Sequence, residues 1–236
     1  MVTRIEGYGT VLLSGIVGST AYGLAGPDSD VDRLGMFAAP TRALLGLNLP
    51  AQSHVTSKPD ATFHEAAKAA RLILAGNPTA SELLWLPEDL YETRTALGDE
   101  AIAIRSSFLS AKRTRDAYLG YATQQFKKLL SRGDEDGARS PEAGRRAAKH
   151  ARHLMRLVEQ GFALYTTGAV TIRLADPERY LAFGEQVAAD PRVAVPFMAE
   201  AEARFDRART ALPDEPDSAA VEAWLLRVRR AFWESA

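Results

Sequence analysis

The sequence contains no cysteine, and this absence excludes several kinds of chemistry at once. Without a thiol there is no disulfide, no zinc site built on thiolates and no cysteine nucleophile. Long apolar runs are missing too: the run at residues 11–17 is too short to cross a bilayer, and no signal-peptide pattern accompanies it. We therefore expect a cytoplasmic protein with no membrane partner.

A strong net charge is also absent, but the charges are unevenly distributed. The 236 residues carry a formal charge of -1, with 46% hydrophobic and 25% charged residues, as in an ordinary soluble globular protein. Residues 101–160 hold 13 lysines and arginines against 6 acids, a net charge of +7, so the rest of the chain is at -8. This asymmetry indicates that the middle of the chain faces an anion.

Hydrophobic patterning predicts an α+β fold in which strands precede helices. Strands are expected at residues 11–17, 31–37 and 60–64. Helices are expected at residues 65–75, 77–86, 99–131, 141–167, 177–189, 195–211 and 217–234, and residues 169–173 are interpreted as an isolated strand or extended link. We expect two domains, a catalytic domain over residues 1–97 and a helical domain over residues 98–236.

The most informative segment follows the first predicted strand. Gly18 and Ser19 come directly after that strand, and Asp30 and Asp32 follow a short loop later. Glycine lets a backbone approach a phosphate, while residues two apart on a strand present their carboxylates on one face. Asp60, at the start of the third predicted strand, is the candidate third carboxylate. The pattern predicts a phosphate loop beside a magnesium site formed by Asp30, Asp32 and Asp60.

Other interpretations of the same residues are weaker. A calcium-binding loop would need Gly and Glu where Arg33 and Ala39 stand, and no Walker loop occurs. An ordinary turn in which the aspartates cap backbone N–H groups remains an alternative.

A basic helix face is predicted in the second half of the chain. Lys149, His153 and Arg156 are spaced i, i+4 and i+7, so they share one face and could contact a triphosphate or a nucleic-acid backbone. A solvated helix face is the alternative. Glu65 and Lys68 are close enough in sequence to form an ion pair with each other.

Several ordered motifs together resemble a known group of enzymes. These motifs are Gly18–Leu24, Ser29–Asp32, Asp60–Lys68, Gly76–Trp85 and Lys149–Leu157. They are similar to the DNA polymerase beta-type nucleotidyltransferase superfamily, and most similar to its RNA-repair-pathway polymerase-beta-like family. The resemblance implies a small mixed sheet with a helical C-terminal region.

The resemblance also implies an activity, in which a nucleoside monophosphate passes from a nucleoside triphosphate to a hydroxyl and pyrophosphate is released. Asp30, Asp32 and Asp60 would bind two Mg²⁺ ions, with Mn²⁺ as an alternative, and Glu65 competes with Asp60 as the third acid. Gly18 and Ser19 would hold the β- and γ-phosphates, and Lys149, His153 and Arg156 would complete nucleotide binding.

The acceptor is left open by the sequence. The charge of residues 101–160 and the family favour an RNA or DNA end. Transfer to a small molecule or a protein hydroxyl, and a non-catalytic nucleotide- or RNA-binding module, are the alternatives. Nothing in the sequence decides between a monomer and a homo-oligomer.

Overall fold

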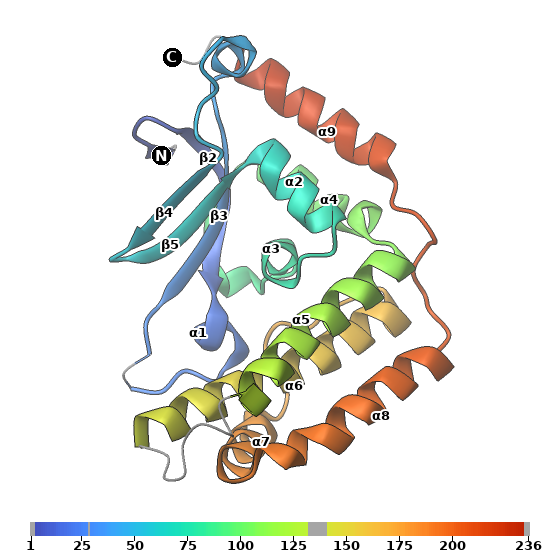
Figure 1. Ribbon diagram of the computed structural model, residues 1–236. Helices are drawn as coiled ribbons and strands as arrows, with labels where there is room; N and C mark the ends of the chain where they lie inside the picture. Colours follow the sequence, from blue (N-terminus) through green and yellow to red (C-terminus); the bar gives the residue numbers. More distant parts are fainter. Residues whose placement is uncertain (1–2, 28, 132–140, 234–236) are drawn as a thin grey trace. The chain divides into compact units, whose positions relative to one another are not determined.

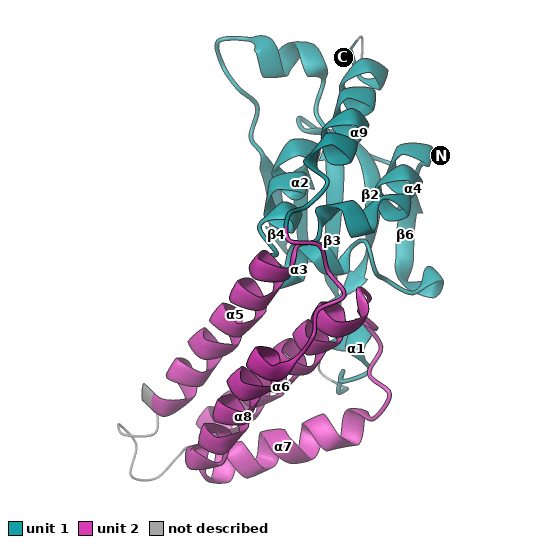
Figure 2. Cartoon of the chain, turned by 90° about the vertical axis from the view of Figure 1, so that its right-hand side faces the viewer, with its two compact units in different colours: residues 1–109, 215–236 teal, residues 110–214 magenta. Residues whose placement is uncertain are grey.

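The computed structural model describes residues 3–27, 29–131 and 141–233. The chain forms two compact units, shown in different colours in Figure 2. The sheet unit comprises residues 1–109 and 215–236, and the helical unit comprises residues 110–214. Each unit is described separately below.

The sheet unit is built around a mixed sheet (Figure 1). Its strands are β1 (Arg4–Ile5), β2 (Gly9–Val17), β3 (Asp32–Ala38), β4 (Ser53–Ser57), β5 (Asp60–Glu65) and β6 (Tyr91–Arg94). They are ordered β1-β2-β3-β5-β4, and β6 pairs with β2. The β3–β5 pairing is parallel, and the other pairings are antiparallel. The parallel pair brings the starts of β3 and β5 to the same end of the sheet.

Helices in the sheet unit begin and end at recognisable sequence signals. They are α1 (Gly18–Tyr22), α2 (Ala66–Leu74), α3 (Pro78–Glu82), α4 (Ala96–Ala103) and α9 (Ser218–Ala231), with 3₁₀ helices at Thr41–Leu45, Glu88–Leu90 and Arg105–Phe108. The Glu65 carboxylate caps α2 by accepting from the Ala67 N–H at 2.8 Å. Gly76, with φ +76°, turns the chain after α2, and the Asn77 side chain caps α3.

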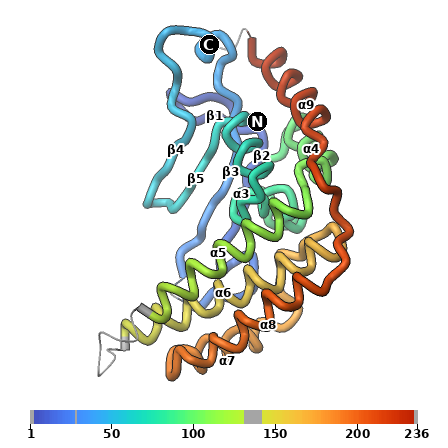
Figure 3. The backbone as a smooth tube through the Cα atoms, turned by 45° about the vertical axis from the view of Figure 1, so that its right-hand side comes forward, coloured from blue at the N-terminus to red at the C-terminus, as the bar shows by residue number. Residues whose placement is uncertain are grey.

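The core of the sheet unit joins the two ends of the chain. β2 buries Val11 and Leu13 completely, and α2 packs on β3 and β5. Helix α9 packs on α2 and α4, and its path beside α4 is visible in Figure 3. Trp224 of α9 is buried, and its indole N–H donates to the Leu97 carbonyl at 2.9 Å. The last helix of the chain is thus part of the unit that the first strands begin.

The helical unit contains α5 (Ala111–Ser131), α6 (Pro141–Thr167), α7 (Pro177–Ala189) and α8 (Ala194–Arg207), with a 3₁₀ helix at Pro191–Val193. Helix α6 packs on α5, α7 and α8. Its Gln160 amide donates to the carbonyls of Thr171 and Ile172, at 3.0 and 3.3 Å. No helix within the described residues is long and apolar enough to cross a membrane.

The α+β fold is confirmed, as are the predicted strands at residues 11–17, 31–37 and 60–64. Residues 169–173 form neither helix nor strand, and the helix expected at 99–131 is interrupted by the segment between α4 and α5. The compact units also differ from the division expected at residues 97 and 98. Helix α9, expected in the helical domain, belongs to the sheet unit because its apolar face packs on α2 and α4.

Candidate functional site

The end of β2 brings Gly18 against Asp32. The β2–β3 register pairs Val17 with Asp32, so Gly18 follows directly beside that carboxylate. Gly18 has φ +69°, in the left-handed region, and a Cβ built on it would lie 2.0 Å from Asp32 Oδ2. Only glycine satisfies both the backbone conformation and the close approach. The predicted phosphate loop, which starts at Gly18, therefore lies next to the Asp32 carboxylate.

A buried hydrogen bond, which the sequence did not lead us to expect, holds helix α1 in place. The Tyr22 hydroxyl contacts both carboxylate oxygens of Glu82, at 2.8 and 2.7 Å. Glu82 is only 3% exposed, so this contact lies within the core. It fixes the helix that begins with Gly18 and Ser19. The available signal was an acidic residue directly before the apolar run Leu83–Leu86.

Asp32 and Asp60 begin neighbouring parallel strands. The register pairs Arg33 with Ala61, which places Asp32 and Asp60 side by side one residue earlier. Residues at matching positions of paired strands project to the same face. Asp60 is exposed, and Asp30 is exposed in the loop before β3. Gly18, Asp32 and Asp60 thus lie at one end of the sheet.

Glu65 occupies a different environment from Asp60. It lies five residues further along β5, about 16 Å away at the usual rise per residue, and projects to the opposite face. Its carboxylate is 2% exposed and accepts from Arg229 Nη1 and Nη2 at 2.6 and 3.1 Å. Glu65 is therefore a buried ion-pair and capping residue. It does not pair with Lys68, whose ammonium donates to Ser53 Oγ instead.

Asp30, Asp32 and Asp60 have the chemistry of metal ligands, but in the structure they do not form a metal-binding cluster. Across the described residues, no group of three or more His, Asp or Glu side chains lies close enough together to hold a metal ion. Carboxylate oxygens at the starts of β3 and β5 are the hard ligands that Mg²⁺ and Mn²⁺ prefer. Coordination by Asp30, Asp32 and Asp60 remains a prediction.

The predicted basic face of α6 separates into an exposed and a buried part. Lys149 is exposed, whereas Arg156 is 2% exposed. The Arg156 guanidinium bonds Gln160 Oε1 at 2.6 Å and His153 Nδ1 at 3.0 Å. Burial and the nearby Arg156 charge lower the pKa of His153 to about 3, so the ring is neutral at pH 7. Arg156 is held inside the helical unit, and its nucleotide-binding role remains a prediction.

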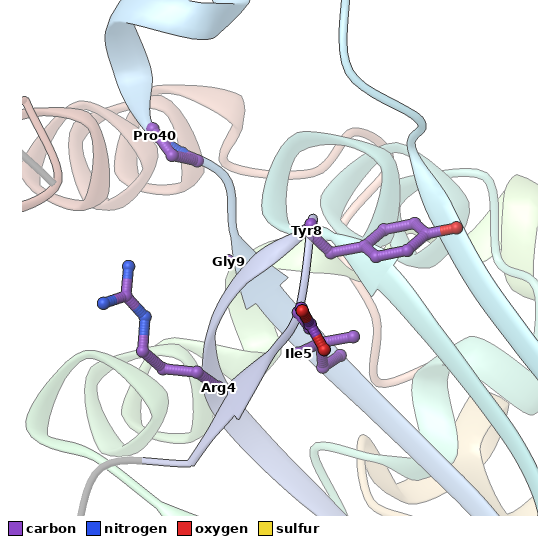
Figure 4. A pocket seen from close by; sticks show the side chains of 7 residues that line it. Arg4, Ile5, Tyr8, Gly9 and Pro40 are labelled. Carbon is purple, nitrogen blue, oxygen red and sulfur yellow. The ribbon is translucent and has the colours of Figure 1, made fainter. Parts of the chain in front are cut away.

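A hollow of about 500 Å³ lies elsewhere in the sheet unit (Figure 4). It is lined by Arg4, Ile5, Glu6, Gly7, Tyr8, Gly9 and Pro40. Gly9 starts β2 and Val17 ends it, so the hollow is about 30 Å of strand away from Gly18. The hollow and the predicted phosphate loop are separate features of the unit.

Comparison with known proteins agrees with the motifs. No curated protein matches the chain at a significant level. A family model for the RNA repair pathway DNA polymerase beta family matches residues 3–173, which is more than half of the 236 residues. The matched segment includes Gly18, Asp30, Asp32 and Asp60. The chain therefore belongs to the RNA repair pathway DNA polymerase beta family, a family of polymerase beta-like nucleotidyltransferases.

Proposed function

We propose that this protein is a divalent-metal-dependent nucleotidyltransferase that acts on a nucleic-acid end. The observation that carries the proposal is the contact between Gly18 and Asp32, with Asp60 in register on the neighbouring strand. A glycine in the left-handed region lets the backbone come close to the Asp32 carboxylate, as a site for phosphate and cation requires.

The roles follow from the chemistry of the groups. The acceptor hydroxyl attacks the α-phosphorus of a nucleoside triphosphate, the bond to the β-phosphate breaks, and pyrophosphate leaves. Backbone N–H groups after Gly18 and the Ser19 hydroxyl bind the departing phosphates. The carboxylates of Asp30, Asp32 and Asp60 would hold Mg²⁺ or Mn²⁺, which would neutralise phosphate charge when bound. Asp60 also accepts the proton of the attacking hydroxyl.

The helical unit contributes binding in this proposal. Lys149 supplies an exposed cation for a phosphate, and the positive charge of residues 101–160 attracts a polyanionic acceptor. Arg156, buried and bonded to His153, positions that neutral imidazole.

The absence of cysteine agrees with a cytoplasmic location.

The test is label transfer. The protein is incubated with Mg²⁺ or Mn²⁺ and each α-labelled nucleoside triphosphate, together with RNA ends, DNA ends, aminoglycosides and protein acceptors. We expect transfer to a polynucleotide end, and its loss in Asp30→Asn, Asp32→Asn and Asp60→Asn. Glu222→Gln, which neutralises an exposed carboxylate on α9, is the matched control and should retain transfer.

The outcomes separate the alternatives. Label on an aminoglycoside or a protein would replace the nucleic-acid acceptor by a small-molecule or protein hydroxyl. Triphosphate binding without transfer, unchanged in Asp32→Asn, would leave only a binding module. Loss of transfer in a folded Glu65→Gln but not in Asp60→Asn would move the third acid to Glu65.

A further inference from the structure

A polar cluster of Ser53, His64 and Lys68 lies outside the predicted phosphate loop and its neighbouring acids. Ser53 on β4 and His64 on β5 are cross-strand partners, and Lys68 belongs to the first turn of α2. Ser53 Oγ is 2.9 Å from His64 Nδ1, and the Lys68 ammonium donates to the same oxygen at 2.7 Å. All three side chains are half-buried, so solvent still reaches the cluster.

The hydrogen bonds have one consistent direction. Burial, and then the charge of Lys68, lower the pKa of His64, so its ring is neutral at pH 7. With the proton of the neutral ring on Nε2, Nδ1 accepts a hydrogen bond from the Ser53 O–H while the Ser53 oxygen accepts one from Lys68. An ammonium has three N–H donors, and only one is used on Ser53. Two donors of Lys68 are left for another acceptor.

Positive charge in this region is not balanced by acids. Among the described residues, neither Lys68 nor Arg71 has a carboxylate partner; Arg71 Nη2 donates to the neutral Gln52 Oε1 at 3.2 Å. The nearby Glu65 carboxylate is already bound by Arg229 and the Ala67 N–H. Within the part of the chain that the structure describes, the Lys68 ammonium and the Arg71 guanidinium therefore lie together without a counter-ion.

The position of Lys68 in α2 adds to this imbalance. The N-terminus of α2 is capped by the Glu65 carboxylate, and the first turn after this cap holds Lys68 and no further acid. Lys68 and Arg71 are three residues apart on α2, so the ammonium and the guanidinium share one side of the helix and can act on the same anion.

We infer that Lys68, held in place by Ser53, and Arg71 form a binding site for a phosphate oxyanion, and that its ligand is a phosphodiester of the nucleic-acid acceptor strand. This inference rests on the proposed function, which supplies the acceptor. Asp60 and His64 are four residues apart on β5, so they share a face about 13 Å apart. A strand lying along β5 would present its reacting end at Asp60 and an internal phosphate at Lys68.

The test measures strand binding separately from catalysis. Fluorescence anisotropy with labelled single-stranded RNA and DNA, over a range of salt concentrations, is performed on the wild-type chain and on Lys68→Met/Arg71→Met. We expect affinity about tenfold weaker or more in the double variant. The slope of log K against log salt should fall by about 0.7, the value for one phosphate on a single strand. Nucleoside triphosphate affinity should not change.

Two matched variants control for charge and folding. Arg230→Met removes an exposed cation of α9 in the same unit and should leave strand binding unchanged. Lys68→Arg/Arg71→Lys keeps both charges and should restore most of the affinity. Urea denaturation of each variant reports on folding.

Every outcome decides the inference. Unchanged affinity and salt slope in a folded Lys68→Met/Arg71→Met overturn it, as does a wild-type chain that binds no oligonucleotide. If Lys68→Met/Arg71→Met weakens only the binding of the nucleoside triphosphate, the site binds a phosphate of the nucleotide. The inference that it binds the acceptor strand is then overturned. The same measurements on Asp32→Asn separate this result from catalysis: retained strand binding supports the site even if no transfer is ever detected.

Discussion

The ion pair between Glu65 and Arg229 gives a quantitative prediction for the sheet unit. Replacing Arg229 by methionine keeps the length of the side chain but leaves a carboxylate that is 2% exposed without its cation. Removal of one partner from a buried pair costs about 3–5 kcal/mol. Glu65 retains the Ala67 N–H at 2.8 Å, and the Arg229 side chain is 18% exposed, so the lower end applies. We expect Arg229→Met to lose ~3 kcal/mol.

The assay is urea unfolding followed by a probe of the sheet unit. At a slope of about 2 kcal/mol per molar urea, the loss lowers the midpoint by about 1.5 M. Arg227→Met is the matched control, because Arg227 lies on the same helix as Arg229 and pairs with Glu100 of α4, and these two side chains are 47% and 40% exposed. That surface pair is worth less than about 1 kcal/mol.

A double-mutant cycle distinguishes the buried charge from the loss of packing. Glu65→Gln/Arg229→Met removes both charges while the glutamine amide oxygen still caps Ala67. We expect the double variant to be more stable than Arg229→Met alone. The reasoning is refuted if Arg229→Met costs no more than Arg227→Met, or if the two changes simply add.

Three further predictions concern other parts of the chain. Because the His153 pKa is lowered from 6.5 to about 3, the unfolded state takes up its proton first. Stability should therefore fall as pH drops from 6.5 towards 3, by at most about 1.4 kcal/mol per pH unit, and His153→Gln should flatten this slope in urea titrations. Gly18→Ala should abolish label transfer and cost about 1–3 kcal/mol, because its Cβ would meet Asp32. Tyr22→Phe should cost about 1–3 kcal/mol in urea unfolding by depriving buried Glu82 of a donor.

Each of these changes has a control or a contrary result. Gly26→Ala is matched to Gly18→Ala, since Gly26 is exposed and its nearest neighbour is 4.0 Å from the added Cβ. Tyr8→Phe serves for Tyr22→Phe, because the Tyr8 ring contributes aromatic contacts in the same unit. If a variant and its control lose the same free energy of unfolding, the contact of Gly18 with Asp32, or of Tyr22 with Glu82, does not have the effect described. Parallel pH curves for wild type and His153→Gln would contradict the neutral imidazole.

The strands with apolar runs were predictable from the sequence, whereas the polar edge strand β4 was not. β2, β3 and β5 carry buried residues that mark them locally. β4 has the sequence Ser-His-Val-Thr-Ser, and its Val55 is exposed, so no apolar alternation identifies it. Its pairing with β5 depends on backbone hydrogen bonds that no side-chain pattern reveals.

The candidate site was predictable as a set of residues but not as an arrangement. The order of Gly18, Asp32 and Asp60 along the chain is a local signal, whereas the register that makes the two acids neighbours is not. Glu65 competed with Asp60 because both are acids in one motif; its partner Arg229 is 164 residues away. Likewise, helical spacing puts Lys149 and Arg156 on one face but cannot say which of them is buried.

The place of α9 has a consequence for synthesis of the protein. The helical unit is inserted between the two parts of the sheet unit, and its own ends meet where the Ala111 N–H donates to the Pro213 carbonyl at 2.8 Å. A ribosome therefore completes the helical unit first, while the strands that carry Gly18 and Asp32 still wait for Trp224 and Arg229. The sheet unit is complete only after translation has passed α9, so prematurely terminated chains expose the apolar surface that proteases and chaperones recognise.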